Sequence, residues 1–325
     1  MEYKDRSTGL IVFGILTVGL GGLCALLILL IFAAQMIPTP ASSPKMPITT
    51  LIPGMAMYAV LAVALVWLGI GSAMATRWSR ALMLIFSWSW LVAGVMGMTV
   101  AAIMVPMMIE NLSSLTPANP DMPAPPQAAM AVGLIIGLGF DGFILIVLPA
   151  VWTFFYNSRH VKATCEAHHP QSSWTDACPL PVLGVVCWLV FTVPMVLVGT
   201  LCGTGVLPFF GVFLAGVSGR IAFVVLGALY LVSAWLLYRL DVRGWWIIVG
   251  IMVFFLVSTI LTFMQRDILD MYRAMNFPPA QLDQLAKMDF FKNKPLLLGL
   301  AGVFAVPIFG YLLYIRRYFQ RPNAV

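Results

Sequence analysis

The sequence predicts an all-α polytopic membrane protein with eight transmembrane helices. Of the 325 residues, 61% are hydrophobic and only 9% are charged, whereas soluble domains carry about 25% charged residues. The apolar residues also gather in long unbroken runs. Such runs lack the alternating pattern of a membrane β-barrel and indicate helices, whose backbone groups are hydrogen-bonded within each segment.

Each apolar run is long enough to cross a bilayer, because a hydrocarbon core about 30 Å thick requires roughly 20 helical residues. The first run follows a short charged stretch and is longer than the apolar core of a signal peptide, so we expect it to be retained as a helix. The predicted spans are 9–34, 55–76, 81–108, 129–156, 180–201, 220–240, 245–264 and 295–314.

The orientation is predicted from the basic residues of the short connections, since Lys and Arg concentrate in cytoplasmic loops. The connections RWSR (77–80) and RLDVR (239–243) fall on one side, and the Pro-rich PTPASSPKMP (38–47) and TPANPDMPAPP (116–126) fall on the other. We therefore expect both termini to be cytoplasmic. The net charge of +6 arises from these clusters at helix ends, so we expect no nucleic-acid partner.

Two motifs recur along the chain and predict an internal repeat of four helices. PAVWTFFYNSR (149–159) and PIFGYLLYIRR (307–317) share the pattern P-x6-Y-x2-R, and SAMATRWSR (72–80) corresponds to SAWLLYRLDVR (233–243). Because each unit has an even number of spans, the two would have the same orientation, related by a pseudo-twofold axis along the membrane normal. The alternative is that helix ends anchored by Tyr and Arg simply look alike.

The predicted organisation has a first four-helix repeat at 1–160, a cytoplasmic Cys/His loop at 161–179 and a second repeat at 180–325. Within the second repeat, 203–219 is short and broken by Gly and Pro, which fits a re-entrant or interfacial element. In 265–294, apolar residues at helical spacing predict short amphipathic helices at the outer surface. We expect two partners. The spans contact the lipid bilayer, and a membrane protein would bind at this outer segment.

Asp141 is the only acidic residue inside an apolar run. A carboxylate within a membrane is costly unless it has a partner or a wet cavity, so Asp141 is a candidate functional site that could couple proton or cation movement. Gly139 and Gly142 beside it would permit close helix approach. The alternative is that Asp141 lies near the outer headgroups, because about 20 residues counted back from Tyr156 end close to it.

The loop RHVKATCEAHHPQSSWTDACP holds all three His residues of the chain together with Cys165 and Cys178. Two thiolates and one or two imidazoles could close a tetrahedral zinc site, with Cys165, His168, His169 and Cys178 as the ligands. Cys178 lacks the close second ligand that zinc ribbons have, so our leading expectation is no cofactor, and zinc is the alternative. A solvated loop whose thiols pack near the interface would explain the same residues.

At residues 159–182, RHVKATCEAHHPQSSWTDACPLPV, the chain resembles uncharacterised bacterial multi-pass membrane proteins. The resemblance covers most of the chain, and we expect the protein to lie in a bacterial cytoplasmic membrane. It implies no activity, substrate or cofactor.

Three functions remain open on these residues. The first is movement or binding of a small or lipophilic molecule between the two halves, with Asp141 as the candidate site. The second is a non-catalytic accessory or scaffold subunit of a membrane complex, favoured by the scarcity of polar groups in the spans. The third is a membrane enzyme with a metal site at Cys165 and Cys178. We name no catalytic residue, and an enzyme is the less favoured class.

Overall fold

The computed structural model describes residues 4–36, 48–113, 127–202, 205–275, 277–287 and 294–319, and eight of its helices are long and apolar enough to cross a membrane. At this level the prediction of an all-α, multi-pass membrane protein is confirmed. The Pro-rich segments 38–47 and 116–126 lie outside the described residues. The spans are α1 (Ser7–Met36), α2 (Ile48–Ala73), α3 (Arg77–Ser113), the continuous α4 (Gln127–Gly142), η1 (Phe143–Val147) and α5 (Leu148–Asn157), then α7 (Leu180–Leu201), α8 (Gly216–Tyr238), α9 (Val242–Gln265) and α13 (Lys294–Ile315).

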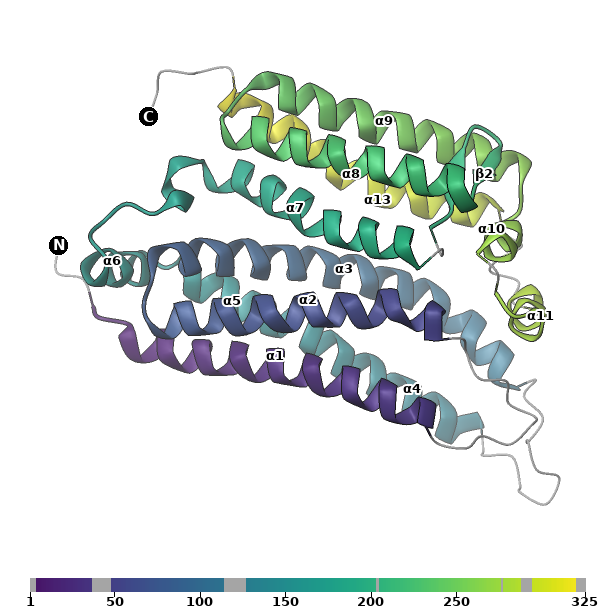
Figure 1. The fold of residues 1–325 in the computed structure, drawn as a ribbon. Coiled ribbons are helices and arrows are strands. Elements are labelled where there is room, and N and C mark those ends of the chain that lie inside the picture. The colour runs from purple at the N-terminus through teal and green to yellow at the C-terminus, as the bar shows by residue number, and fades with distance from the viewer. Residues whose placement is uncertain are drawn as a thin grey trace.

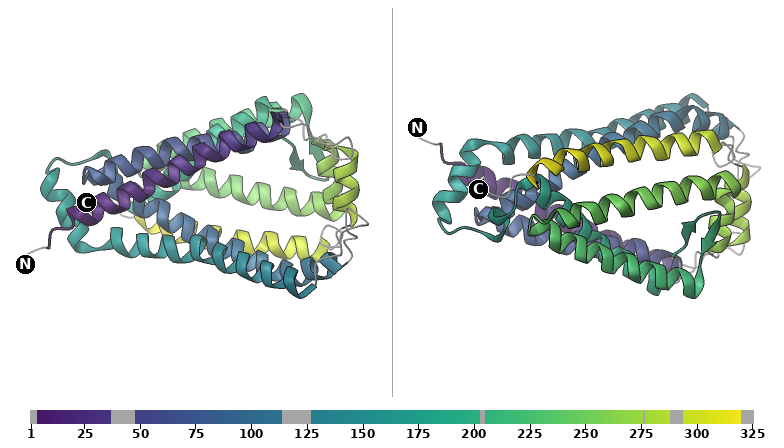
Figure 2. Two further views of the ribbon diagram at one scale, coloured as in Figure 1. Left: turned by 90° about the horizontal axis from the view of Figure 1, so that it is seen from below. Right: turned by 90° about the horizontal axis from the view of Figure 1, so that it is seen from above.

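The helices taper toward one end of the molecule. α1 begins and α13 ends at this end, which also carries α6 (Arg159–His168), and we call it the termini end (Figure 1). The opposite end, here the far end, carries β2 (Val212–Leu214), α10 (Ile268–Ala274) and α11 (Pro279–Lys287). The spans lie close together at the termini end and spread apart toward the far end (Figure 2).

The first four spans are held by a close helix pair and by a core near the termini end. α1 and α2 approach closely where Gly14 faces Gly69, because a Cβ on either glycine would come within 2.7 Å of a carbonyl oxygen on the other helix. Small residues commonly permit such approach between membrane helices. The core joins Leu10 of α1 and Met83 of α3 to the fully buried Trp152 of α5.

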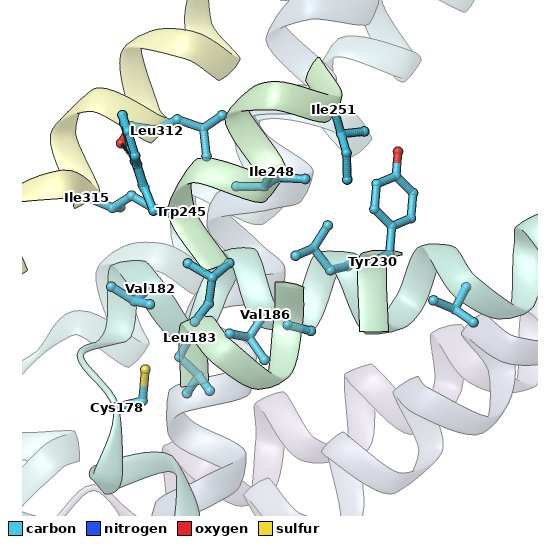
Figure 3. Packing of buried hydrophobic residues seen from close by; sticks show 14 of the residues in the cluster. Cys178, Val182, Leu183, Val186, Tyr230, Trp245, Ile248, Ile251, Leu312 and Ile315 are labelled. Carbon is cyan, nitrogen blue, oxygen red and sulfur yellow. Dashed lines mark hydrogen bonds between the residues drawn. The ribbon is translucent and has the colours of Figure 1, made fainter. Parts of the chain in front are cut away.

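The last four spans have their own core, which α7, α8, α9 and α13 build together (Figure 3). Leu183 and Leu237 are fully buried in it, and Trp245 of α9 packs beside Leu312 and Ile315 of α13. The Trp245 indole Nε1 donates a hydrogen bond of 2.7 Å to the Leu312 carbonyl oxygen. This bond fixes α9 to α13 near the termini end.

The two sets of spans meet through α7, which lies against α2 and α3. The Trp188 indole Nε1 donates to the Ser89 hydroxyl oxygen at 2.7 Å. Within the second set, the Tyr311 hydroxyl of α13 donates to the Pro181 carbonyl oxygen at 2.9 Å. Among the described residues, α7 is therefore one element through which the halves contact each other.

The apolar segment before α8, expected to be re-entrant or interfacial, contains an antiparallel β-hairpin of β1 (Leu207–Phe209) and β2. Its turn has positive φ at Phe210 (43°) and Gly211 (93°), the combination found in the two-residue turns that match strand twist. The hairpin packs on α9, where the Phe210 and Gly211 amides donate to the Ser258 and Thr262 hydroxyls at 3.1 and 3.0 Å. These side chains give the turn partners that lipid would not supply.

In segment 265–294 the described residues form two short helices, α10 and α11, in keeping with its apolar pattern. Asp267 starts α10 with a capping box, in which its side chain and that of Asp270 each accept from the other's backbone amide. Three statements stay predictions: these helices face the outside of the cell, both termini are cytoplasmic, and the two halves are repeats.

Candidate functional site

Asp141 lies on the surface of the fourth span, well inside the limits of the continuous helix from Gln127 to Asn157. Its side chain is exposed in the last turn of α4, and no hydrogen bond or ion pair engages it among the described residues. The next residues form the π-helical turn η1, a geometry that occurs often at functional sites. A functional role for Asp141 stays a prediction. The π-helical turn that follows it is an additional feature in favour of such a role.

The π-helical turn η1 approaches α3 closely. A Cβ on Gly94 of α3 would clash with the carbonyl oxygen of Leu145 and lie 2.8 Å from its carbonyl carbon. Gly142, one residue after Asp141, faces the end of the Met98 side chain. Glycine at position 94 therefore permits the contact that holds η1 against α3.

The predicted Cys/His loop is partly helical, because 159–168 forms α6 and Trp174–Ala177 forms the short helix η2. The structure separates its two thiols: Cys165 is 1% exposed in the first core, and Cys178 is 4% exposed in the second. His168 Nδ1 lies 2.9 Å from the Thr164 carbonyl oxygen, and His169 Nε2 lies 3.1 Å from that of Met74. The four predicted ligands are thus not brought together.

Burial raises the pKa of the Cys165 and Cys178 thiols to about 11. Each is therefore a neutral thiol at physiological pH, whereas zinc is bound by thiolates. Among the described residues, no group of three or more His, Cys, Asp or Glu side chains is close enough to hold a metal ion. Zinc binding here stays a prediction, and it would require the segment to rearrange.

The segment between the halves is clamped to the turn between α2 and α3 by Arg77. The Arg77 Nε lies 3.2 Å from Asp176 Oδ2, and its Nη2 lies 3.7 Å from Glu166 Oε1. Its Nη1 donates to the Pro170 carbonyl oxygen at 3.3 Å. The basic residue that indicated orientation in the sequence therefore also has a structural role.

The same segment contacts two other parts of the termini end. The backbone amides of Lys4 and Arg6 donate to His160 Nδ1 at 3.3 Å and to the Thr164 hydroxyl at 3.1 Å. The Tyr238 hydroxyl donates to the Trp174 carbonyl oxygen at 2.9 Å. Residues 158–178 thus link the N-terminal stretch, the α2–α3 turn and the end of α8.

An apolar groove of about 480 Å³ lies between α9 and α13. Trp245, Leu312 and Ile315, each at most 3% exposed, pack together at the termini end, where the two helices are joined. Every lining residue is apolar: Leu256 and Ile260 of α9, and Leu298, Gly302, Ala305, Val306, Phe309, Gly310 and Leu313 of α13.

The groove coincides with a difference between the two P-x6-Y-x2-R motifs. In the first motif, Trp152 and Tyr156 are both fully buried. In the second motif, Gly310 stands at the position of Trp152 and lines the groove, and Tyr314 at the position of Tyr156 is 46% exposed. The second half thus lacks the large side chain that fills the first core.

An ion pair joins the two helices of the groove at the far end. Lys294 Nζ, in the first turn of α13, lies 2.8 Å from Asp267 Oδ1, just after the end of α9. Lys294 precedes Leu298 by four residues, so both lie on the face of α13 that lines the groove. The groove is thus bounded by the Trp245 contacts at one end and by this ion pair at the other.

Comparison of the chain with protein-family models, with curated proteins and with solved structures finds no match. The function must therefore be argued from the residues themselves.

Proposed function

We propose that this protein binds the acyl chain of a lipophilic molecule in the groove between α9 and α13. The observation that carries the proposal is the wholly apolar lining of that groove. Its volume of about 480 Å³ is within the range of roughly 300–1,000 Å³ typical of small-molecule sites. The groove lies within the second half, whereas the sequence pattern suggested a site between the halves.

The length of the groove also suits an acyl chain. Its lining on α13 runs from Leu298 to Leu313, about 22 Å at a rise of 1.5 Å per residue. One leaflet of a bilayer core is about 15 Å thick, half of the whole. A chain lying along α13 would therefore be enclosed on two sides by helix while its open side faces lipid.

Binding of a polar solute is less well supported. Such a site needs several convergent polar groups, and the described residues that line the groove supply no polar side chain. Asp141 lies on another span and does not line this groove.

The test uses the full-length protein in phosphatidylcholine vesicles that contain a lipid with a photoreactive diazirine in its acyl chain. Cross-linked residues are identified by mass spectrometry. We expect labelling per residue at Leu256, Ile260 and Phe309 to exceed by several-fold that of Ile15 and Leu29 on α1, which are 64% and 65% exposed. Equal labelling would mean an ordinary lipid-facing surface and would favour the scaffold alternative.

Two variants that fill the groove, and one control variant, test whether the acyl chain binds there. A Cβ on Gly302 or Gly310 has no atom within 4 Å, so Gly302→Leu and Gly310→Leu can fold normally while occupying the groove. Both should reduce groove labelling by more than half. Gly250 of α9 has equally open space but does not line the groove, so Gly250→Leu should leave the labelling unchanged.

A further inference from the structure

The ion pair between Lys294 and Asp267 is exposed enough to be exchanged. The Lys294 side chain is 43% exposed and that of Asp267 is 61% exposed. Ion pairs at such positions contribute only about 0–1 kcal/mol, because water competes for both charges. A second anion that reached Lys294 could therefore replace Asp267 at little cost.

Lys294 is placed where the headgroup of a bound lipid would lie. It begins α13 one turn before Leu298, at the far end of the groove lining. An acyl chain that lies along this lining has its polar end at the far end, because the buried Trp245 and Leu312 pack together at the other end and leave no room for a headgroup there. The charge that would meet the headgroup is the ammonium of Lys294.

Two other described cations of the far end, Arg273 and Arg266, have different partners. Arg273 lies 2.7 Å from Asp270 within α10, and the Arg266 Nε donates to the Gly211 carbonyl oxygen of the hairpin at 3.2 Å. Arg266 follows Thr262 by four residues, on the side of α9 that faces the hairpin, whereas Leu256 and Ile260 face the groove. Of Arg266, Arg273 and Lys294 at the far end, Lys294 is thus the one that shares a helix face with the groove lining.

From this arrangement we infer that the groove binds a phospholipid whose phosphate pairs with Lys294 and displaces Asp267, an inference that rests on the proposed function. Asp267 then keeps its second contact, the capping box that starts α10. Lys294 serves as a selective headgroup site, and Asp267 serves as the anion that occupies it when no phospholipid is bound. An ammonium group is a common phosphate partner in proteins.

The test compares two photoreactive lipids with identical acyl chains, phosphatidylglycerol and diacylglycerol, in the same vesicles. The readout is the ratio of their labelling at Leu256, Ile260 and Phe309 in the intact protein. We expect phosphatidylglycerol to be preferred, and Lys294→Gln to lower the preference by about two- to fivefold, the range of an exposed ion pair. Asp267→Asn should raise it by a similar factor, because Asn can still cap α10 while it frees Lys294.

Arg273→Gln is the matched control, since it removes a cation from the same surface but not from the groove face. The inference is overturned if Lys294→Gln leaves the ratio unchanged, or if Arg273→Gln lowers it equally. In either case groove labelling above that of α1 would still support the proposed function. Labelling no greater than that of α1 with both lipids would instead refute the proposed function itself, and this inference with it.

Discussion

The hydroxyl oxygens of Ser72 and Tyr156 lie 2.6 Å apart in the core of the first half and join α2 to α5. Ser72 also donates to the Leu10 carbonyl oxygen of α1 at 3.1 Å. A serine hydroxyl has one hydrogen, so Tyr156 is the donor of the bond between them. One buried serine thereby links three spans at the termini end.

Loss of Ser72 should destabilise the protein more than loss of the Tyr156 hydroxyl. Tyr156→Phe removes one hydrogen bond, worth about 0.6 kcal/mol in membrane proteins, and leaves Ser72 paired with Leu10. Ser72→Ala leaves the buried Tyr156 hydroxyl without its acceptor, which costs about 1–3 kcal/mol. Equilibrium unfolding of both variants in mixed micelles measures the difference, and equal losses would contradict the assigned donor.

Ser233, which the predicted repeat pairs with Ser72, should behave differently. It is fully buried, and its hydroxyl has no hydrogen-bond partner among the described residues. Ser233→Ala removes a desolvated polar group without breaking a bond, so we expect unchanged or slightly higher stability. The same unfolding measurement checks this, and a loss above about 1 kcal/mol would show that the hydroxyl has a partner.

Gly94→Ala should destabilise the contact between α3 and the π-helical turn η1. The added methyl would meet backbone atoms of Leu145, which cannot move aside as a side-chain end can, and overpacking of this kind costs about 1–3 kcal/mol. Gly97, on the same helix, has open space around its Cβ position. Gly97→Ala is therefore the control, and thermal unfolding should separate the two variants clearly.

The raised pKa values of Cys165 and Cys178 predict slow and strongly pH-dependent alkylation. With a pKa of about 11 against the ordinary 9.0, the thiolate fraction near pH 8 is roughly a hundredfold lower than in the denatured protein. The rate of iodoacetamide labelling should rise tenfold per pH unit from 7 to 10. A plateau near pH 9 at either cysteine would contradict burial of that thiol.

The same pKa values have a consequence for stability. Because the folded thiols have the higher pKa, the folded state holds its protons more strongly than the unfolded state. The stabilisation is complete below pH 9 and decreases as pH rises from 9 toward 11. Cys165→Ala should reduce this alkaline loss of stability, which unfolding measurements between pH 8 and pH 11 can detect.

Removal of the Arg77 side chain should loosen the segment between the halves. Arg77→Ala eliminates the contacts with Glu166, Asp176 and Pro170, and we expect maleimide labelling of Cys165 at neutral pH to accelerate about tenfold, equivalent to roughly 1.4 kcal/mol. Lys162→Ala removes only an exposed pair with Glu166 and should have little effect. Similar rates in the two variants would show that Arg77 is not the clamp.

The sequence pattern does not predict the candidate groove, although it contains one signal of it. Lys294, Leu298, Gly302, Ala305 and Phe309 recur every three or four residues and mark one face of α13. What the sequence does not tell is which helix this face meets. Asp141 is conspicuous in the sequence because it is a charged residue in an apolar run, whereas the apolar residues that line the groove resemble their neighbours.

The number and approximate positions of the spans, the break before α8 and the short helices after α9 can be read from the sequence alone. Their exact limits cannot, because α2 begins at Ile48 and not at 55, and α3 ends at Ser113 and not at 108. The features that can be read follow from local properties, since the transfer of a segment into hydrocarbon depends on its own residues. The packing of the helices, in contrast, assigns Cys165 and Cys178 to different cores, buries Tyr156 while Tyr314 stays exposed, and leaves a groove between α9 and α13. The physical reason is that lipid tails are as apolar as leucine, so the same residue types face lipid and neighbouring helices, and hydrophobic periodicity does not identify the partner of a membrane helix.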